Sequence, residues 1–220
     1  MADRKAVQQT MSEHELLDIY DRSMNWLGTE TREKVHREGY WHQTFHCWVY
    51  GSSDDEEDGL LLQLRHQDKD TFPGYLDISC AGHLLAGEKI EDGVRELAEE
   101  LGVTAEVQDL EYCGQVRQDY VDGKLKDREM THIYIYECGR RLEEYDFQKS
   151  EISGLFRPTI QEFMELISGR RDSVVMKGVL YDETTGELRS VSRRVSAADI
   201  TPQTPEYYEV LFQRLAKDPG

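Results

Sequence analysis

Residues 82–103 read Gly-His-Leu-Leu-Ala-Gly-Glu-Lys-Ile-Glu-Asp-Gly-Val-Arg-Glu-Leu-Ala-Glu-Glu-Leu-Gly-Val, a glycine-containing loop followed by a strong helical pattern. The pattern predicts a helix over about 91–101, because apolar residues recur there at helical spacing. These residues are Val94, Leu97, Ala98 and Leu101. Gly102 follows directly and is a signal for the end of a helix. We therefore expect one side of this helix to be buried against a core.

Three glutamates of the predicted helix, Glu96, Glu99 and Glu100, are spaced i, i+3 and i+4, so their carboxylates share one face. Three like charges repel each other unless a cation lies between them. Oxygen ligands on a rigid helix suit Mg²⁺ or Mn²⁺, which also bind phosphates. Gly82 and Gly87 allow the preceding loop to turn tightly near such a cation. On their own, however, the glutamates favour an ordinary solvated acidic face.

The whole string closely resembles the Nudix box, the signature of the Nudix hydrolases. Gly82 and Glu88 have the spacing of the first half of the box, and 95–103 (Arg-Glu-Leu-Ala-Glu-Glu-Leu-Gly-Val) match its complete second half. Only six residues, 89–94, separate Glu88 from Arg95, where the usual pattern has seven. The role of Glu88 therefore stays open, with Glu91 as a partial replacement.

The resemblance implies an α+β fold, an α/β/α sandwich on a mixed sheet, and hydrolysis of a small diphosphate-containing substrate of the nucleoside-diphosphate type. It implies that Glu96, Glu99 and Glu100, helped by the Gly82 carbonyl and Glu88, bind Mg²⁺ (or Mn²⁺) and that the metal activates water without a covalent intermediate. One of the glutamates, or an acidic residue of a later loop, would act as the base. Arg95 would orient a glutamate.

A second resemblance covers about residues 15–165 and is to the type I isopentenyl-diphosphate isomerases, a branch of the Nudix superfamily. It rests on 15–21 (Glu-Leu-Leu-Asp-Ile-Tyr-Asp), His36, 41–46 (Trp-His-Gln-Thr-Phe-His) and 81–83 (Ala-Gly-His). It implies a metal site of three imidazoles and two carboxylates, with one carboxylate also catalytic. The residues at comparable places are His36, His42, His83, Asp127 and the catalytic acid Glu129.

The isomerases need a cysteine immediately before the Gly-His dipeptide, and this chain has Ala81 there, with Cys80 one position earlier. Neighbouring residues of a strand point to opposite faces, so Cys80 does not replace it. The chain thus resembles hydrolases on an isomerase-like scaffold. An isomerase-like enzyme and a non-catalytic nucleotide-binding regulator remain alternatives.

The histidines also have an ordinary interpretation as hydrogen-bonded structural residues. That interpretation is favoured for His36, His46 and His132, and it competes with the metal role for His42. For His83 and Glu129 the two interpretations are balanced. Three arginines, Arg65, Arg117 and Arg128, are candidates for binding substrate phosphates, although arginines at such places are often structural.

The charge of the chain is strongly negative, with 26 Lys+Arg against 44 Asp+Glu and a net charge of −18. Such a surface repels phosphate backbones, which argues against a nucleic-acid polymer as partner. No apolar run approaches the roughly 20 residues that span a bilayer, and no signal peptide is evident, so we expect a cytoplasmic protein without membrane contact. The four cysteines form no C-x-x-C pair and are expected to be free thiols.

The chain divides by pattern into a flexible tail (1–13), a catalytic domain (14–170) and a C-terminal hairpin and helix (171–220). The last part is expected to close over the site or to form a homodimer contact. Within the domain, a turn is expected at 25–28 and short helices at 31–37 and 159–167. Strands are expected at 15–20, 42–50, 60–65, 75–81, 105–117, 129–137 and 154–156. The C-terminal part is expected as strands 173–181 and 187–195 and helix 205–215.

Overall fold

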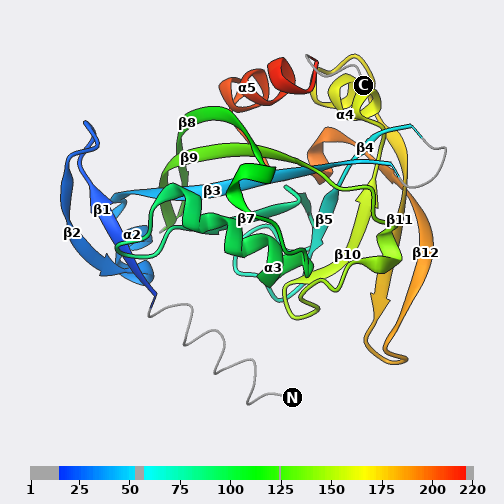
Figure 1. The fold of residues 1–220 in the computed structure, drawn as a ribbon, viewed down its shortest axis with the longest axis horizontal. Coiled ribbons are helices and arrows are strands. Elements are labelled where there is room, and N and C mark those ends of the chain that lie inside the picture. The colour runs from blue at the N-terminus through cyan, green and yellow to red at the C-terminus, as the bar shows by residue number, and fades with distance from the viewer. Residues whose placement is uncertain (1–14, 53–56, 124, 217–220) are drawn as a thin grey trace. The chain divides into compact units, whose positions relative to one another are not determined.

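The computed structural model describes residues 15–52, 57–123 and 125–216 (Figure 1). The chain forms two compact units. The first unit comprises Met1–Phe45, Gly82–Gly93 and Gly114–His132, and the second comprises His46–Ala81, Val94–Cys113 and Ile133–Gly220. The tail predicted at 1–13 lies outside the described residues, and the predicted boundary at residue 170 stays a prediction.

The first unit begins with an antiparallel hairpin of β1 (Leu16–Tyr20) and β2 (Trp26–Thr31), which helix α2 (Arg32–Glu38) contacts (Figure 1). Helix α2 begins where the Thr31 side chain accepts the backbone N–H of Lys34, and it ends at Gly39 with φ 74°. The turn predicted at 25–28 is wrong, because the Asp21 carboxylate accepts the N–H groups of Ser23 and Asn25 and closes the turn earlier.

Four strands have residues in both units: β3 (Trp41–Gly51), β7 (Cys80–His83), β8 (Glu111–Asp122) and β9 (Leu125–Glu137). Together with β1, β2 and the two-residue β4 (Gly59–Leu60) they make a seven-stranded sheet. Its order is β2-β1-β3-β9-β8, and β4 and β7 also pair with β3. The strand predicted from residue 105 begins only at Glu111, because residues 107–109 form a 3-10 turn held by Glu106 and Asp109.

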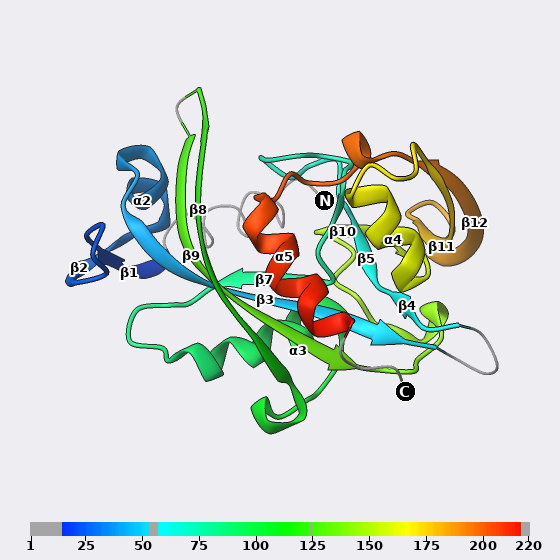
Figure 2. The ribbon, with the colours of Figure 1, turned by 90° about the horizontal axis from the view of Figure 1, so that it is seen from above.

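The second unit contains an antiparallel five-stranded sheet of order β12-β11-β10-β5-β6. Its strands are β5 (Leu62–Arg65), β6 (Leu76–Asp77), β10 (Ile152–Arg157), β11 (Val174–Asp182) and β12 (Glu187–Val195). Helix α4 (Ile160–Ile167) contacts β11 (Figure 2). It begins at a capping box in which Thr159 and Glu162 bond each other's backbone N–H.

Two predicted strands are each divided between the sheets. The strand expected at 60–65 consists of β4, paired with β3, and β5, paired with β10. The strand expected at 75–81 likewise consists of β6, paired with β5, and β7, paired with β3. The segment between β4 and β5 and the segment between β6 and β7 are bonded to each other through Ser79. Its hydroxyl donates to Leu61 O and accepts the backbone N–H of Val49 on β3 at 2.8 Å.

The C-terminal hairpin and helix are confirmed as β11, β12 and α5 (Pro205–Leu215). Helix α5 buries Tyr207, Leu211 and Leu215. The Tyr207 hydroxyl lies 3.1 Å from His46 Nδ1 and accepts a hydrogen bond of 2.9 Å from Trp48 Nε1. The predicted α+β class is confirmed. None of the described helices is both long and apolar enough to cross a membrane.

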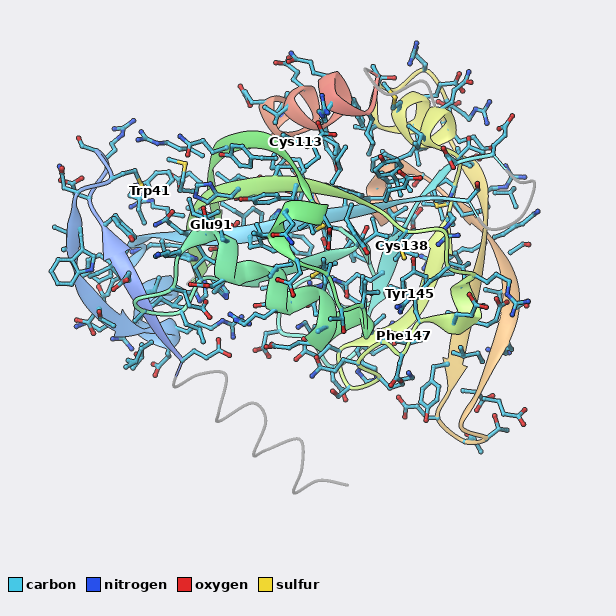
Figure 3. All side chains as sticks on the ribbon, in the orientation of Figure 1. Trp41, Glu91, Cys113, Cys138, Tyr145 and Phe147 are labelled. Carbon is cyan, nitrogen blue, oxygen red and sulfur yellow. The ribbon has the colours of Figure 1, made fainter. Side chains whose placement is uncertain are left out.

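The four cysteines are free thiols, as predicted. Cys47 and Cys80 are buried, and Cys113 and Cys138 are partly exposed. Figure 3 labels Cys138 together with Tyr145 and Phe147 of the second unit. Burial, followed by the neighbouring Cys138, raises the pKa of the Tyr145 hydroxyl. Tyr145 and Phe147 therefore belong to the apolar interior of the second unit, where they are 2% and 1% exposed, whereas Cys138 is partly exposed.

Candidate functional site

The glutamates of the Nudix-like segment lie on helix α3 (Arg95–Leu101) in the second unit. The helix is shorter than predicted, because residues 90–94 form a 3-10 turn and Val94 offers no side-chain cap. Gly93 of this turn packs closely against Phe45, because an added Cβ at Gly93 would lie only 2.5 Å from the Phe45 side chain. The helix ends as predicted at Gly102, with φ 65°.

Helix α3 turns two of its three glutamates inward. Glu96 is 9% and Glu100 8% exposed, on the same side as the fully buried Leu97 and Leu101. The Glu99 side chain is 55% exposed. Ala98, which the sequence pattern placed in the apolar stripe, is exposed, so that part of the prediction is wrong. Spacings of i, i+4 put Glu96 and Glu100 directly above one another, which explains why they are buried together.

Two hydrogen bonds hold the Glu100 carboxylate. Its Oε2 accepts the backbone N–H of Ala81 at 3.1 Å and the Gln63 side-chain amide at 3.3 Å. Burial, followed by the charge of Glu96, raises the pKa of Glu100 from 4.5 to about 8. Two buried carboxylates in mutual repulsion are a donor set of hard oxygens, which is the set that Mg²⁺ or Mn²⁺ prefers. The residues therefore fit a divalent cation.

Arg95 contacts both neighbouring acids of the helix. Its Nη1 donates to Glu96 Oε1 at 2.6 Å and to Glu99 Oε2 at 3.1 Å. Lys69 supplies a further positive charge that acts to lower the pKa of Glu100, and its own Nζ donates to Glu151 Oε2 at 2.8 Å. Arg95 thus orients the carboxylates of Glu96 and Glu99.

Gly82 on β7 and Glu88 in the loop that follows this strand belong to the first unit. Glu88 Oε2 accepts the Leu85 N–H at 2.7 Å, and Asp18 Oδ2 accepts the N–H of Gly87 at 2.9 Å. Gly87 has φ 82°, a conformation that favours glycine. In this structure the Glu88 carboxylate therefore stabilises the turn of the loop itself.

A second group of ligand-type side chains lies in the first unit. The rings of His36 on α2, His42 on β3 and His83 on β7 have centroids 5.1–5.2 Å apart. Candidate ligand atoms of the three histidines lie within 4.8 Å of one another, and so do those of His42, Asp127 and Glu129. All five residues belong to the first unit, which brings them together from four elements. We call them the histidine centre.

The tautomer and the protonation state of His42 are those of a metal ligand. Its side chain is fully buried, and its Nδ1–H donates to Tyr40 O at 3.1 Å, which leaves the lone pair on Nε2. That Nε2 lies 3.5 Å from Asp127 Oδ1, and both atoms are buried without a hydrogen bond to any described residue. Burial lowers the pKa of His42 from 6.5 to about 4, so the imidazole is neutral at neutral pH. Neutral imidazoles and carboxylates fit a divalent metal.

His46 and His132 have structural partners. His46 Nδ1 lies 3.1 Å from the Tyr207 hydroxyl, and His132 Nε2 lies 2.9 Å from Gln43 Oε1. His36, for which the sequence favoured the same kind of role, instead lies in the histidine centre, with Nε2 3.5 Å from Asp127 Oδ1. The position of His36 on a helix did not by itself indicate this role, whereas the resemblance to the isomerases had placed it among the metal residues.

The three arginines considered for phosphate binding lie in different settings. Arg65 is engaged in the second unit, where it donates to Asp77 Oδ2 at 2.6 Å, to Thr71 O at 2.9 Å and to Thr71 Oγ1 at 3.1 Å. Arg117 and Arg128 line a cavity in the first unit.

The sequence did not predict the role of Gln63, the side chain that donates to Glu100. An isolated glutamine in a strand carries no signal of such a role.

Comparison with known proteins agrees with both resemblances. Residues 41–176 match the NUDIX domain family. An uncharacterised Nudix hydrolase of Clostridium acetobutylicum is 38% identical over 206 residues, which cover 94% of this chain and 99% of that protein. An isopentenyl-diphosphate Δ-isomerase of Serratia proteamaculans is 33% identical over 122 residues, which cover 55% of this chain and 65% of that protein.

A solved structure shows the same fold. A Deinococcus radiodurans protein superposes with a TM-score of 0.51 and 21% identity, over 70% of this chain and 90% of its own. The domain match, the extensive similarity to the Clostridium protein and the glutamates of α3 agree with one another. The chain belongs to the Nudix hydrolase family.

Proposed function

We propose that this protein hydrolyses a diphosphate linkage in a small substrate of the nucleoside-diphosphate type and that the reaction depends on Mg²⁺ (or Mn²⁺). The observation that carries the proposal is the buried pair of Glu96 and Glu100 on helix α3. Folding places two repelling carboxylates together at the cost of desolvating both, an arrangement that a bound cation would relieve. Membership of the Nudix family supports the same reaction.

In the proposed site, Glu96, Glu99 and Glu100 would hold the cation, which would neutralise charge at the diphosphate and lower the pKa of a water molecule. The chain's own residues do the positioning. The Ala81 N–H and Gln63 fix Oε2 of Glu100, and Arg95 fixes one oxygen each of Glu96 and Glu99. A carboxylate of this set would take the proton of the attacking water, because a bound cation would keep these carboxylates ionised and able to accept it.

We further propose that the histidine centre holds a second divalent metal through His36, His42, His83, Asp127 and Glu129. Support comes from the buried His42 Nε2 and Asp127 Oδ1, which have no hydrogen-bond partner among the described residues. Glu129 would also act as a catalytic acid. Its Oε2 accepts a hydrogen bond from Thr131 at 3.3 Å, and Thr131 is in turn bonded to Thr44 at 3.1 Å, so the carboxyl is oriented.

The test of hydrolysis uses purified protein with Mg²⁺ and a panel of nucleoside diphosphate derivatives. The expected result is release of a nucleoside monophosphate, measured by chromatography. Glu99→Gln and Glu100→Gln should each abolish the release, whereas Glu209→Gln, an exposed glutamate on α5, should leave it unchanged. Activity that persists in both α3 variants contradicts the proposed site. Nucleotide binding without turnover by any substrate of the panel would favour a regulator instead.

An isomerase-like activity on isopentenyl diphosphate is the alternative that the similarity to isomerases favours. The structure supplies an argument against it at the position of Ala81. The neighbouring Cys80 is fully buried, and burial, followed by Glu100, raises the pKa of its thiol well above 9.0. This thiol therefore stays protonated and has no route to a bound alkene. Incubation with the substrate in deuterated water should give no deuterium incorporation, and incorporation would restore the alternative.

A further inference from the structure

A hollow of about 510 Å³ that is open to solvent lies in the first unit, and its Arg22, Arg117 and Asp119 are exposed. Its walls carry three guanidinium groups, one carboxylate and one indole. The lining residues are Arg22, Trp41, Arg117, Asp119 and Arg128. We call it the arginine cavity. Figure 3 labels its Trp41, at the beginning of β3.

The arginine cavity is positive in a chain that is otherwise strongly negative. Three arginines and one aspartate give 3 − 1 = +2 in the cavity, against −18 for the whole chain. Arg128 is held in place, since its Nε donates to Asp119 Oδ1 and its Nη1 to Gly39 O, each at 3.1 Å. No ion pair joins Arg22 or Arg117 to another residue within 15–52, 57–123 and 125–216. Two positive charges therefore face the cavity without compensation.

Trp41 and Arg117 form a stacked pair on the wall. The Arg117 guanidinium lies 5.8 Å from the centroid of the Trp41 ring, within the range of a cation–π contact. Such a contact limits the motion of the guanidinium without using its N–H donors. Arginine donors in a fixed plane match the oxygens of a phosphate. The wall thus combines an aromatic surface with donors that are ready for an anion.

The arginine cavity lies on the opposite face of the sheet from the histidine centre. Successive side chains of a strand point to opposite faces, so Trp41 points away from His42 on β3, and Arg128 points away from Asp127 and Glu129 on β9. Observed contacts agree with this alternation. Thr44 bonds Thr131 on the face of His42 and Glu129, and Gln43 bonds His132 on the face of Trp41 and Arg128. The cavity is therefore no part of the histidine centre.

We propose that the arginine cavity is a separate binding site for a nucleoside phosphate. The dianionic phosphate pairs with Arg22 and Arg117, and the base lies against the indole of Trp41. Asp119 holds Arg128 and limits the charge to the +2 that one phosphate neutralises. This site goes beyond the proposed hydrolysis and does not depend on it.

The test measures binding of AMP by isothermal titration in EDTA, so that sites requiring a divalent cation do not contribute. The wild-type chain should bind AMP, and the double variant Arg22→Ala/Arg117→Ala should bind it at least about tenfold more weakly, as expected when charge-assisted contacts are lost. A matched double variant, Arg189→Ala/Arg194→Ala, removes two exposed arginines from β12 and should bind AMP like the wild type. Thermal denaturation verifies that each variant is folded.

Further variants and ligands make the test specific. Asp119→Asn removes the negative charge of the cavity and should tighten AMP binding severalfold. Adenosine and pyrophosphate should each bind more weakly than AMP, because each lacks one half of the proposed contacts. Equal affinity for pyrophosphate and AMP would overturn the role of Trp41. Unchanged AMP affinity in the Arg22/Arg117 double variant would overturn the site, and so would loss of AMP binding in Glu100→Gln. Hydrolysis is measured separately with Mg²⁺, so the two proposals fail independently.

Discussion

Glu96 and Glu100 lie one helical turn apart on α3 and are both turned inward, where 9% and 8% of their surfaces remain exposed. An ordinary amphipathic helix places apolar residues on that side and leaves acids to the solvent. The inward orientation raises the pKa of Glu100 to about 8, through burial first and Glu96 second. A cation bound by this pair, as proposed, would relieve the repulsion and stabilise the helix.

Mg²⁺ should therefore stabilise the wild type more than it stabilises Glu100→Gln. At a Mg²⁺ concentration 100 times the dissociation constant, binding should stabilise the wild type by about 2.7 kcal/mol. In EDTA the variant should be as stable as the wild type or more stable, because it removes one of two repelling carboxylates. Thermal denaturation with and without Mg²⁺ measures both effects. An equal Mg²⁺ effect in the two proteins would contradict the assignment.

The histidine centre should bind Co²⁺, whose visible absorption reports nitrogen and oxygen ligands. His42→Ala should weaken binding by at least about 100-fold, since even residues behind the ligands change metal affinity by 10–100-fold. His66→Ala is the matched control, because His66 lies in the second unit and its Nε2 is bonded to Glu183 at 2.9 Å. A spectrum that survives His42→Ala, or that disappears in His66→Ala, would contradict the centre.

Asp77→Asn should destabilise the second unit at neutral pH by about 3–5 kcal/mol, because Arg65 is left partly buried without its ion pair. Burial alone would raise the pKa of Asp77, but Arg65, Thr201 and the Ile78 N–H together hold it below 3.8. Since the folded-state pKa is depressed, the stabilisation is complete above the unfolded-state value and is lost as the pH falls through the folded-state pKa.

The difference in unfolding free energy between wild type and Asp77→Asn should thus be constant from about pH 5 upward and shrink below about pH 4. Urea denaturation across this range measures it. Asp146→Asn is the control, because Asp146 is 94% exposed and its pair with Lys149 should contribute little. A difference that grows in acid would show that Asp77 is not stabilised as an anion.

Tyr207→Phe should destabilise the protein by about 1–3 kcal/mol, because two buried partners, His46 and Trp48, lose the hydroxyl that they share. The neighbouring Tyr208→Phe serves as the control and should have a smaller effect. Urea denaturation followed by tryptophan fluorescence measures both variants. Equal losses would show that the hydroxyl of Tyr207 contributes nothing specific to the attachment of α5.

Local sequence chemistry was sufficient for much of the fold. Gly102 predicts the end of α3, and Thr159 with Glu162 accompanies the beginning of α4, because caps and stop signals act within a few residues. The C-terminal hairpin and helix followed from alternation and turn residues in the same way. The division of 60–65 and 75–81 between two sheets did not follow, because the choice of partner strand is a long-range property.

In the candidate site, too, some features follow from the local sequence and others only from the folded structure. The spacing of Glu96, Glu99 and Glu100 is a property of one helix, so it was evident from the chain alone. Which of the three turn inward depends on what packs against the helix, and only the folded second unit buries Glu96 and Glu100 beside Gln63 and Ala81. Likewise, His36 lies next to His42 and His83 only because three separate elements meet in the first unit. Short-range hydrogen bonding and periodicity act along the chain, whereas burial and ligand geometry arise between segments that only folding brings into contact.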